Sequence, residues 1–197
     1  MPSTEHKPSL AAAYSPEHRQ ILLRLAWDSI HHGLAQGSPL PVQTADYPSP
    51  LQAPHACFVT LQKQGRLRGC IGHLEAVRPL VEDVAGNAYA AAFQDPRFPP
   101  VQTRELEQIT LEISVLSEAE PLRFDDREGL LQKIRPGIDG LILSSPDGHR
   151  GTFLPSVWEA LPSAEQFLRQ LVIKAGLPPG YWSNDLHLAR YTSESFG

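Results

Sequence analysis

Residues 57–72, CFVTLQKQGRLRGCIG, contain two runs of alternating apolar and polar side chains that meet at a Gln64-Gly65 step. Runs of this length, rich in β-branched and aromatic residues and separated by a glycine-containing turn, are typical of a β-hairpin. No strand–helix–strand rhythm follows along the chain. We therefore predict an α+β fold with a largely antiparallel sheet flanked by helices.

The length of the hairpin loop decides which way Cys70 points. A two-residue loop would place Val59 opposite Cys70 and would mix apolar and basic side chains on one face. A three-residue loop over residues 63–65, with Gly65 left-handed, places Phe58 opposite Cys70 and separates an apolar face from a mixed face. We adopt the three-residue loop because it sorts the side chains better.

Two interpretations of Cys70 follow from this register. In the first, Cys70 lies beside Arg68 on the mixed face, where a neighbouring guanidinium favours the nucleophilic thiolate form of cysteine. Gly69 and Gly72 leave the backbone open to a ligand or to another element. In the second, Cys70 is a small buried hydrophobe under an alanine-rich helix. Cys57 lies on the opposite face in either case and cannot form a disulfide with Cys70.

The rest of the chain predicts a mixture of helices, loops and strands. Five prolines between residues 38 and 54 predict an extended loop. We expect residues 1–13 to be a disordered tail and residues 14–197 to form a single domain. The expected helices are 16–37, 79–93, 127–134 and 163–175, with a helical turn at 103–106, and the further strands are 109–116, a second hairpin around Pro146-Asp147-Gly148, and 186–196.

Composition excludes several classes of protein. A net charge of −5 and a pI near 5.9 disfavour nucleic-acid binding, since such proteins usually carry a basic face. No apolar run reaches the roughly 20 residues of a membrane span, and the N-terminus lacks a signal-peptide core, so we expect a cytoplasmic protein. The two cysteines and eight histidines lack metal-ligand spacing, so no metal and no cofactor is predicted.

A family resemblance adds to these patterns. LRGCIG at 67–72 resembles the signature hexapeptide of the AMMECR domain family, also called AmmeMemoRadiSam system protein A. The likeness continues through DPRFPP (95–100), EISVL (112–116), GIDGLIL (137–143), GTFLPSVWE (151–159), FLRQLVIKAGLP (167–178) and RYTSE (190–194). It implies one domain of two unequal lobes. It also implies a shared pathway with a Memo-like protein and a radical S-adenosylmethionine enzyme, after which the family is named.

The resemblance implies a site around Cys70. Carried over residue by residue, it gives Cys70 as a nucleophile or redox thiol, and we assign Glu112 and Asp95 as acid or base. The substrate-binding residues would be Arg68, Arg97, Gly69 and Gly72. The resulting hypothesis is a cysteine-dependent transferase or hydrolase, and the alternative is a non-catalytic adaptor that binds a partner. Structural roles stay open: Asp95 could brace the helix end, Arg97 could pair with Asp95, and Glu112 could face solvent.

Overall fold

A computed structural model describes residues 14–197 of the chain, which divides into two compact units. Unit 1 runs to Ser114 and is completed by Glu194–Gly197, while unit 2 is Val115–Ser193. The α+β prediction is confirmed, although there are two four-stranded antiparallel sheets instead of one. The expected tail, residues 1–13, lies outside the described residues, and the single-domain assignment stays a prediction. No helix within residues 14–197 is long and apolar enough to cross a membrane.

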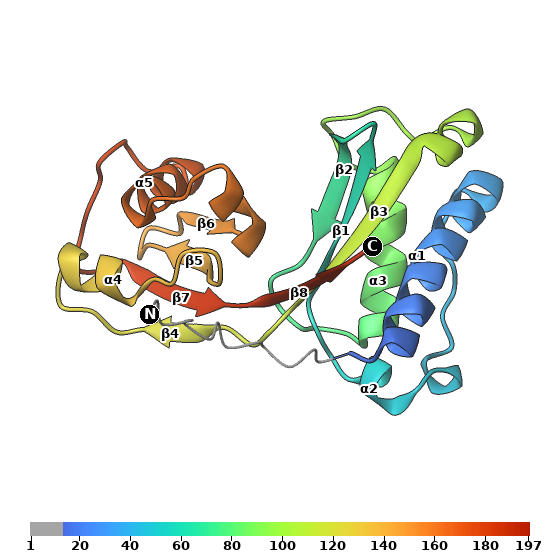
Figure 1. The fold of residues 1–197 in the computed structure, drawn as a ribbon, viewed down its shortest axis with the longest axis horizontal. Coiled ribbons are helices and arrows are strands. Elements are labelled where there is room, and N and C mark those ends of the chain that lie inside the picture. Colours follow the sequence, from blue (N-terminus) through green and yellow to red (C-terminus); the bar gives the residue numbers. More distant parts are fainter. Residues whose placement is uncertain (1–13) are drawn as a thin grey trace, which may run out of the picture. The chain divides into compact units, whose positions relative to one another are not determined.

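Unit 1 packs two helices on one side of a sheet with the strand order β2-β1-β3-β8. Helix α3 contacts β1 and β2, and α1 lies against α3 (Figure 1). Strand β2 is therefore an edge strand. The elements are α1 (Pro16–Gln36), η1 (Thr44–Asp46), α2 (Ser49–Gln52), β1 (Cys57–Lys63), β2 (Arg66–Gly72), α3 (Leu80–Phe93), η2 (Thr103–Gln108), β3 (Ile109–Leu116) and β8 (Ser193–Phe196).

Unit 2 has its own sheet and its own core. The strand order is β4-β7-β5-β6, and the ring of Trp158 stacks on Phe167 of α5 with 3.8 Å between the ring centroids. Both rings belong to a buried cluster that includes Leu141 and Leu143 of β5. The elements are β4 (Glu120–Leu122), α4 (Arg127–Lys133), β5 (Gly140–Ser144), β6 (Arg150–Phe153), η3 (Pro155–Glu159), α5 (Ala164–Lys174) and β7 (His187–Tyr191).

Helix boundaries agree closely with the sequence patterns. The side chain of Ser15 accepts the N–H of His18 at the start of α1, and Gly37 ends that helix with a φ of 70°. Two predictions were wrong in part. The proline-rich loop contains the short helices η1 and α2, and Pro50 lies in the first turn of α2, where proline is tolerated. The expected final strand is broken at Thr192 into β7 and β8, which belong to different sheets.

The prediction of a three-residue hairpin loop is also wrong. Gln64 and Gly65 both have positive φ, 54° and 72°, so the loop has two residues and Lys63 pairs with Arg66. The extra residue lies in the strand instead: Gln62 pairs with Leu67 and Leu61 with Gly69, so Arg68 is the unpaired residue of a β-bulge.

The bulge returns the residues beyond it to the faces predicted from the sequence, with apolar side chains on one face and mixed side chains on the other. Beyond the bulge Thr60 pairs with Cys70, so Cys70 keeps its predicted place on the face opposite Val59, although its partner is Thr60 and not Phe58. Leu67 moves to the Gln62 face and is 44% exposed. The sequence pattern could not place the extra residue because a longer loop and a bulge each shift the register by one residue, in opposite directions, and so give the same alternation of faces.

Gly69 sets the distance between the sheet and α3. A Cβ atom at this position would overlap the backbone carbonyl oxygen of Ala91 in α3. Backbone cannot move aside as a flexible side chain does, so glycine is required for this close approach.

We expect Gly69→Ala to lower the free energy of unfolding by about 2–3 kcal/mol, because the added methyl group forces α3 away from the sheet. Gly86→Ala is the matched control within α3, where the nearest atom is the mobile end of Arg78 at 3.4 Å. That change should leave stability unchanged or raise it by up to about 1 kcal/mol. Urea unfolding of both variants measures the difference, and equal stabilities would contradict the close approach.

Candidate functional site

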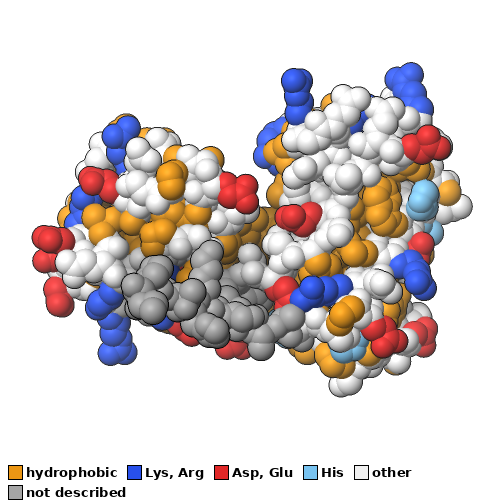
Figure 2. Space-filling model, viewed as in Figure 1, with side chains coloured by type: hydrophobic (Ala, Val, Ile, Leu, Met, Phe, Trp, Pro, Cys, Tyr) orange, Lys and Arg blue, Asp and Glu red, His pale blue; other side chains and the backbone are white. Residues whose placement is uncertain are grey.

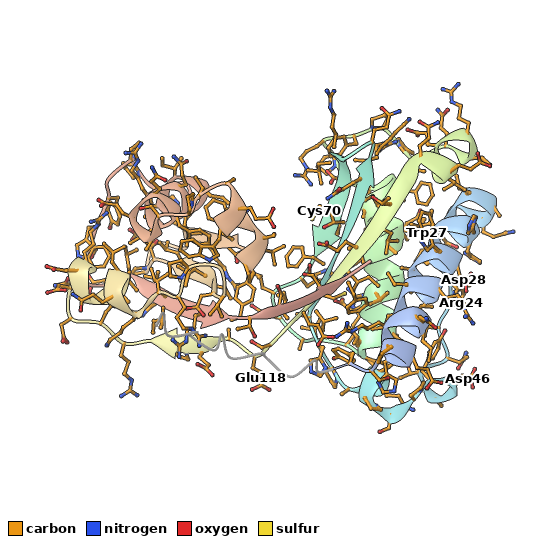
Figure 3. The ribbon with its side chains drawn as sticks, in the orientation of Figure 1. Arg24, Trp27, Asp28, Asp46, Cys70 and Glu118 are labelled. Atoms are coloured by element: carbon orange, nitrogen blue, oxygen red, sulfur yellow. The ribbon has the colours of Figure 1, made fainter. Side chains whose placement is uncertain are left out.

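Cys70 is half-buried on the edge strand β2, on the side of the sheet away from α3 (Figure 3). Its cross-strand partner is Thr60, whose hydroxyl donates a hydrogen bond to the Cys70 sulfur over 3.4 Å. The thiol is therefore both reachable and supported by a polar neighbour.

An ion pair from the DPRF segment holds the backbone of Cys70. The N–H of Cys70 donates to Oδ2 of Asp95 over 2.9 Å, and Nη2 of Arg97 donates to the Cys70 carbonyl over 3.2 Å. Arg97 also binds both carboxylate oxygens of Asp95, through Nε at 2.9 Å and Nη2 at 2.7 Å. Asp95 and Arg97 together thus supply the acceptor and the donor that a neighbouring strand would offer to this edge.

The ion pair with Arg97 keeps the Asp95 carboxyl group negatively charged. The carboxyl group is 1% exposed, and its hydrogen bonds from the Arg97 side chain hold its pKa well below the usual range, against the opposing effect of burial. The backbone N–H groups of Cys70 and Arg97 act in the same direction as the guanidinium. A carboxyl group that stays ionised at neutral pH is suited to positioning, so these contacts favour a brace over proton transfer. The acid–base role of Asp95 stays a prediction.

Arg68 belongs to a second ion-pair group. The bulge directs it to Glu105 of η2, which accepts from Nε at 3.3 Å and from Nη2 at 3.1 Å, while Lys63 donates to the same carboxylate over 3.0 Å. Arg68 first, and Lys63 with it, lower the pKa of Glu105 to about 2 despite its burial. Arg68 and Arg97 both lie over the ring of Phe98, with 6.0 and 5.5 Å from guanidinium carbon to ring centroid.

The remaining sequence-predicted residues are less close to the thiol. Gly69 contacts α3, and a Cβ at Gly72 would overlap the ring of Phe58, its cross-strand partner. These packing contacts account for both glycines, so their binding roles stay predictions. Glu112 is an exposed residue of β3, which β1 separates from β2, and two strand spacings amount to about 10 Å. The structure therefore groups Cys70 with Asp95 and Arg97 but not with Glu112.

The other cysteine lies in a buried polar cluster that the sequence patterns missed. Cys57 is fully buried, its sulfur donates to Oδ2 of Asp83 over 3.3 Å, and Asn87 donates to both groups. Burial, followed by the Asp83 charge, raises the pKa of the Cys57 thiol well above its usual value. A signal was present, because Asp83 and Asn87 lie one turn apart within an alanine-rich helical stretch. This thiol is suited to packing.

Thr60 and Glu105 were also missed as site residues. The signal for Glu105 is the capping box at the start of η2, where Gln102 and Glu105 bind each other's backbone N–H groups. Nothing local marks Thr60, whose role depends on the strand register. Within residues 14–197, no group of three His, Cys, Asp or Glu side chains is arranged to hold a metal ion.

Comparison with known proteins gives consistent matches over the chain. Residues 23–196 match the AMMECR1 family model. A protein of Methanothermobacter thermautotrophicus is 37% identical over 191 residues, covering 94% of this chain and 96% of the relative. A protein of Saccharolobus islandicus is 44% identical over 140 residues, covering 68% of this chain and 62% of the relative. The crystal structure of the uncharacterized protein PH0010 from Pyrococcus horikoshii matches with a TM-score of 0.85 and 34% identity, over 93% of this chain and 92% of that one.

Asp95→Asn should lower the free energy of unfolding at pH 7 by about 2–3 kcal/mol, the order expected for losing hydrogen bonds to a charged group. Because the folded-state pKa lies below the unfolded value of about 3.9, the stabilisation is complete above that value and is lost as the pH falls through the folded-state pKa. Urea unfolding at pH 7, 4 and 3 measures the difference between the wild type and the variant.

Asp28→Asn on the outer surface of α1 is the matched control, and we expect it to change stability by less than about 0.5 kcal/mol (Figure 3). A difference between the wild type and Asp95→Asn that stays constant from pH 7 to pH 3 would contradict the assigned ion pair.

Proposed function

The chain belongs to the AMMECR1 family, and from this premise we propose that it acts through the Cys70 thiol as a cysteine-dependent transferase or hydrolase for an anionic substrate. The observation that carries the proposal is the contrast between the two cysteines. Cys57 is fully buried and has a raised pKa, whereas Cys70 is half-exposed and accepts a hydrogen bond from the Thr60 hydroxyl. Reactive cysteines lie in partly exposed sites with an electropositive neighbour, which here is the Arg97 guanidinium bound to the Cys70 carbonyl.

The rigidity of the Cys70 backbone supports nucleophilic attack. Its N–H and its carbonyl are both held by the Asp95–Arg97 pair, so the sulfur extends from a fixed position. Fixing a nucleophile in place before reaction lowers the entropic part of the barrier. The Arg97 side chain is 53% exposed beyond these contacts and can pair with a substrate carboxylate or phosphate.

The reaction would proceed in two steps, acylation of Cys70 and then deacylation. Cys70 gives its thiol proton to solvent, its sulfur bonds to an electrophilic acyl carbon of the substrate, and the leaving group departs with the electron pair of the broken bond. A water molecule or a second nucleophile then attacks the acyl carbon and breaks the carbon–sulfur bond, which restores the thiol. Water gives a hydrolase, and another acceptor gives a transferase.

The proposal extends to the cellular setting. We infer action in the cytoplasm, in a pathway with a Memo-like protein and a radical S-adenosylmethionine enzyme. The support is the run of motifs from LRGCIG to RYTSE along the chain.

Iodoacetamide treatment of the native protein should modify Cys70 and leave Cys57 unmodified, because only the Cys70 sulfur is reachable. Both should react after denaturation. Thr60→Val should slow Cys70 modification at pH 7 by about fivefold, the effect of losing a hydrogen bond of about 1 kcal/mol, while Thr60→Ser keeps the donor and the rate. Peptide mass spectrometry over time measures all three rates.

Modification of Cys70 only after denaturation would refute the thiol chemistry and would favour the non-catalytic adaptor. Equal rates for wild type, Thr60→Val and Thr60→Ser would show that the Thr60 hydroxyl does not assist the reaction of the Cys70 thiol.

A further inference from the structure

A polar pocket of about 400 Å³ lies in unit 1, apart from the Cys70 thiol. It is formed by the end of β1, the bulge of β2, two prolines of the loop between α3 and η2, and η2 itself. Figure 2 shows Lys and Arg side chains projecting at the end of unit 1 where the β1–β2 turn and η2 lie. The lining residues are Lys63, Arg68, Pro99, Pro100, Gln102, Arg104, Glu105 and Gln108.

The pocket is basic on a protein that is acidic as a whole. Lys63, Arg68 and Arg104 contribute three positive charges, and Glu105 contributes the one negative charge of the lining. Glu105 is already bonded to Lys63 and Arg68, and within residues 14–197 Arg104 has no ion-pair partner. The surplus of two positive charges contrasts with the net charge of −5 for the whole chain. Such a local surplus attracts anions.

Arg68 provides a second, independent indication of a ligand. Its side chain is 10% exposed, and its Nη1 atom is buried without a hydrogen-bond acceptor in the described structure. A buried, charged donor without an acceptor is unfavourable, so Glu105 alone does not satisfy the Arg68 guanidinium. Together with the surplus positive charge of the lining, this favours an anion in the pocket.

The arrangement of the basic groups is built into the fold. The β-bulge turns Arg68 out of the strand ladder, and Glu105 is itself fixed by the Gln102 capping box. Because Glu105 binds two guanidinium nitrogens of Arg68, the remaining nitrogen has a defined direction. Arginine held in this way recognises phosphate through its planar donors.

We propose that this pocket binds a phosphate group, either the free ion or the phosphate of a small phosphorylated metabolite. Two surplus charges match a phosphate dianion better than a singly charged carboxylate. This binding site is independent of the proposed Cys70 chemistry.

Calorimetric titration of the full chain with inorganic phosphate and with glycerol 3-phosphate tests the proposal, at pH 7.5 and at constant ionic strength. Both probes are mainly dianions there, since their second pKa is about 6 to 7. We expect saturable binding that weakens at least tenfold in Arg104→Gln. Arg104 is exposed, so this change removes a pocket charge without disturbing the core.

Arg24→Gln on α1 removes the same charge from an exposed position outside the pocket and should leave binding unchanged (Figure 3). Tighter binding of inorganic phosphate would identify the free ion as the ligand, and tighter binding of glycerol 3-phosphate would identify a phosphate ester. No saturable binding of either probe, or equal weakening in Arg104→Gln and Arg24→Gln, would overturn the proposal. Iodoacetamide reactivity of Cys70 is unaffected by either outcome.

Discussion

The buried carboxylate of Asp95 is the constraint on which the site depends. An edge strand exposes backbone N–H and carbonyl groups that need partners, and at Cys70 the Asp95–Arg97 pair provides both. The same carboxylate accepts the backbone N–H of Arg97 over 3.1 Å, which sets the turn of the loop after α3. One buried charge therefore joins the cysteine segment to the DPRF segment 25 residues later.

The bulge at Arg68 places two polar side chains of the hairpin, Arg68 and Cys70, in two different sites. Without the extra residue, Arg68 and Cys70 would lie on the same face of β2, as the alternation of a regular strand requires. The bulge sends Arg68 to Glu105 and the basic pocket, while Cys70 keeps its place beside Thr60. The LRGCIG segment thus contributes a thiol to one site and a guanidinium to another.

Local patterns predicted the elements but not the contacts between them. The helix caps at Ser15 and Gly37 and the outer limits of the hairpin, Cys57 and Gly72, follow from side-chain chemistry over a few residues. The position of the bulge does not, since a longer loop gives the same alternation. The contact between Asp95 and Cys70 depends on how α3 returns the chain to the sheet edge, which no short pattern encodes. The sheet change at Thr192 likewise depends on the rest of the fold.

The Asp95 carboxylate takes the place of a neighbouring strand at Cys70, and amide hydrogen exchange measured by NMR can detect this replacement. We predict that the Cys70 amide is protected in the wild type although β2 is an edge strand, and that Asp95→Asn reduces this protection. The His73 amide, which donates to the Cys57 carbonyl, should keep its protection in both proteins. A Cys70 amide that exchanges freely in the wild type, or that stays equally protected in Asp95→Asn, would show that the Asp95 carboxylate does not hold this strand edge.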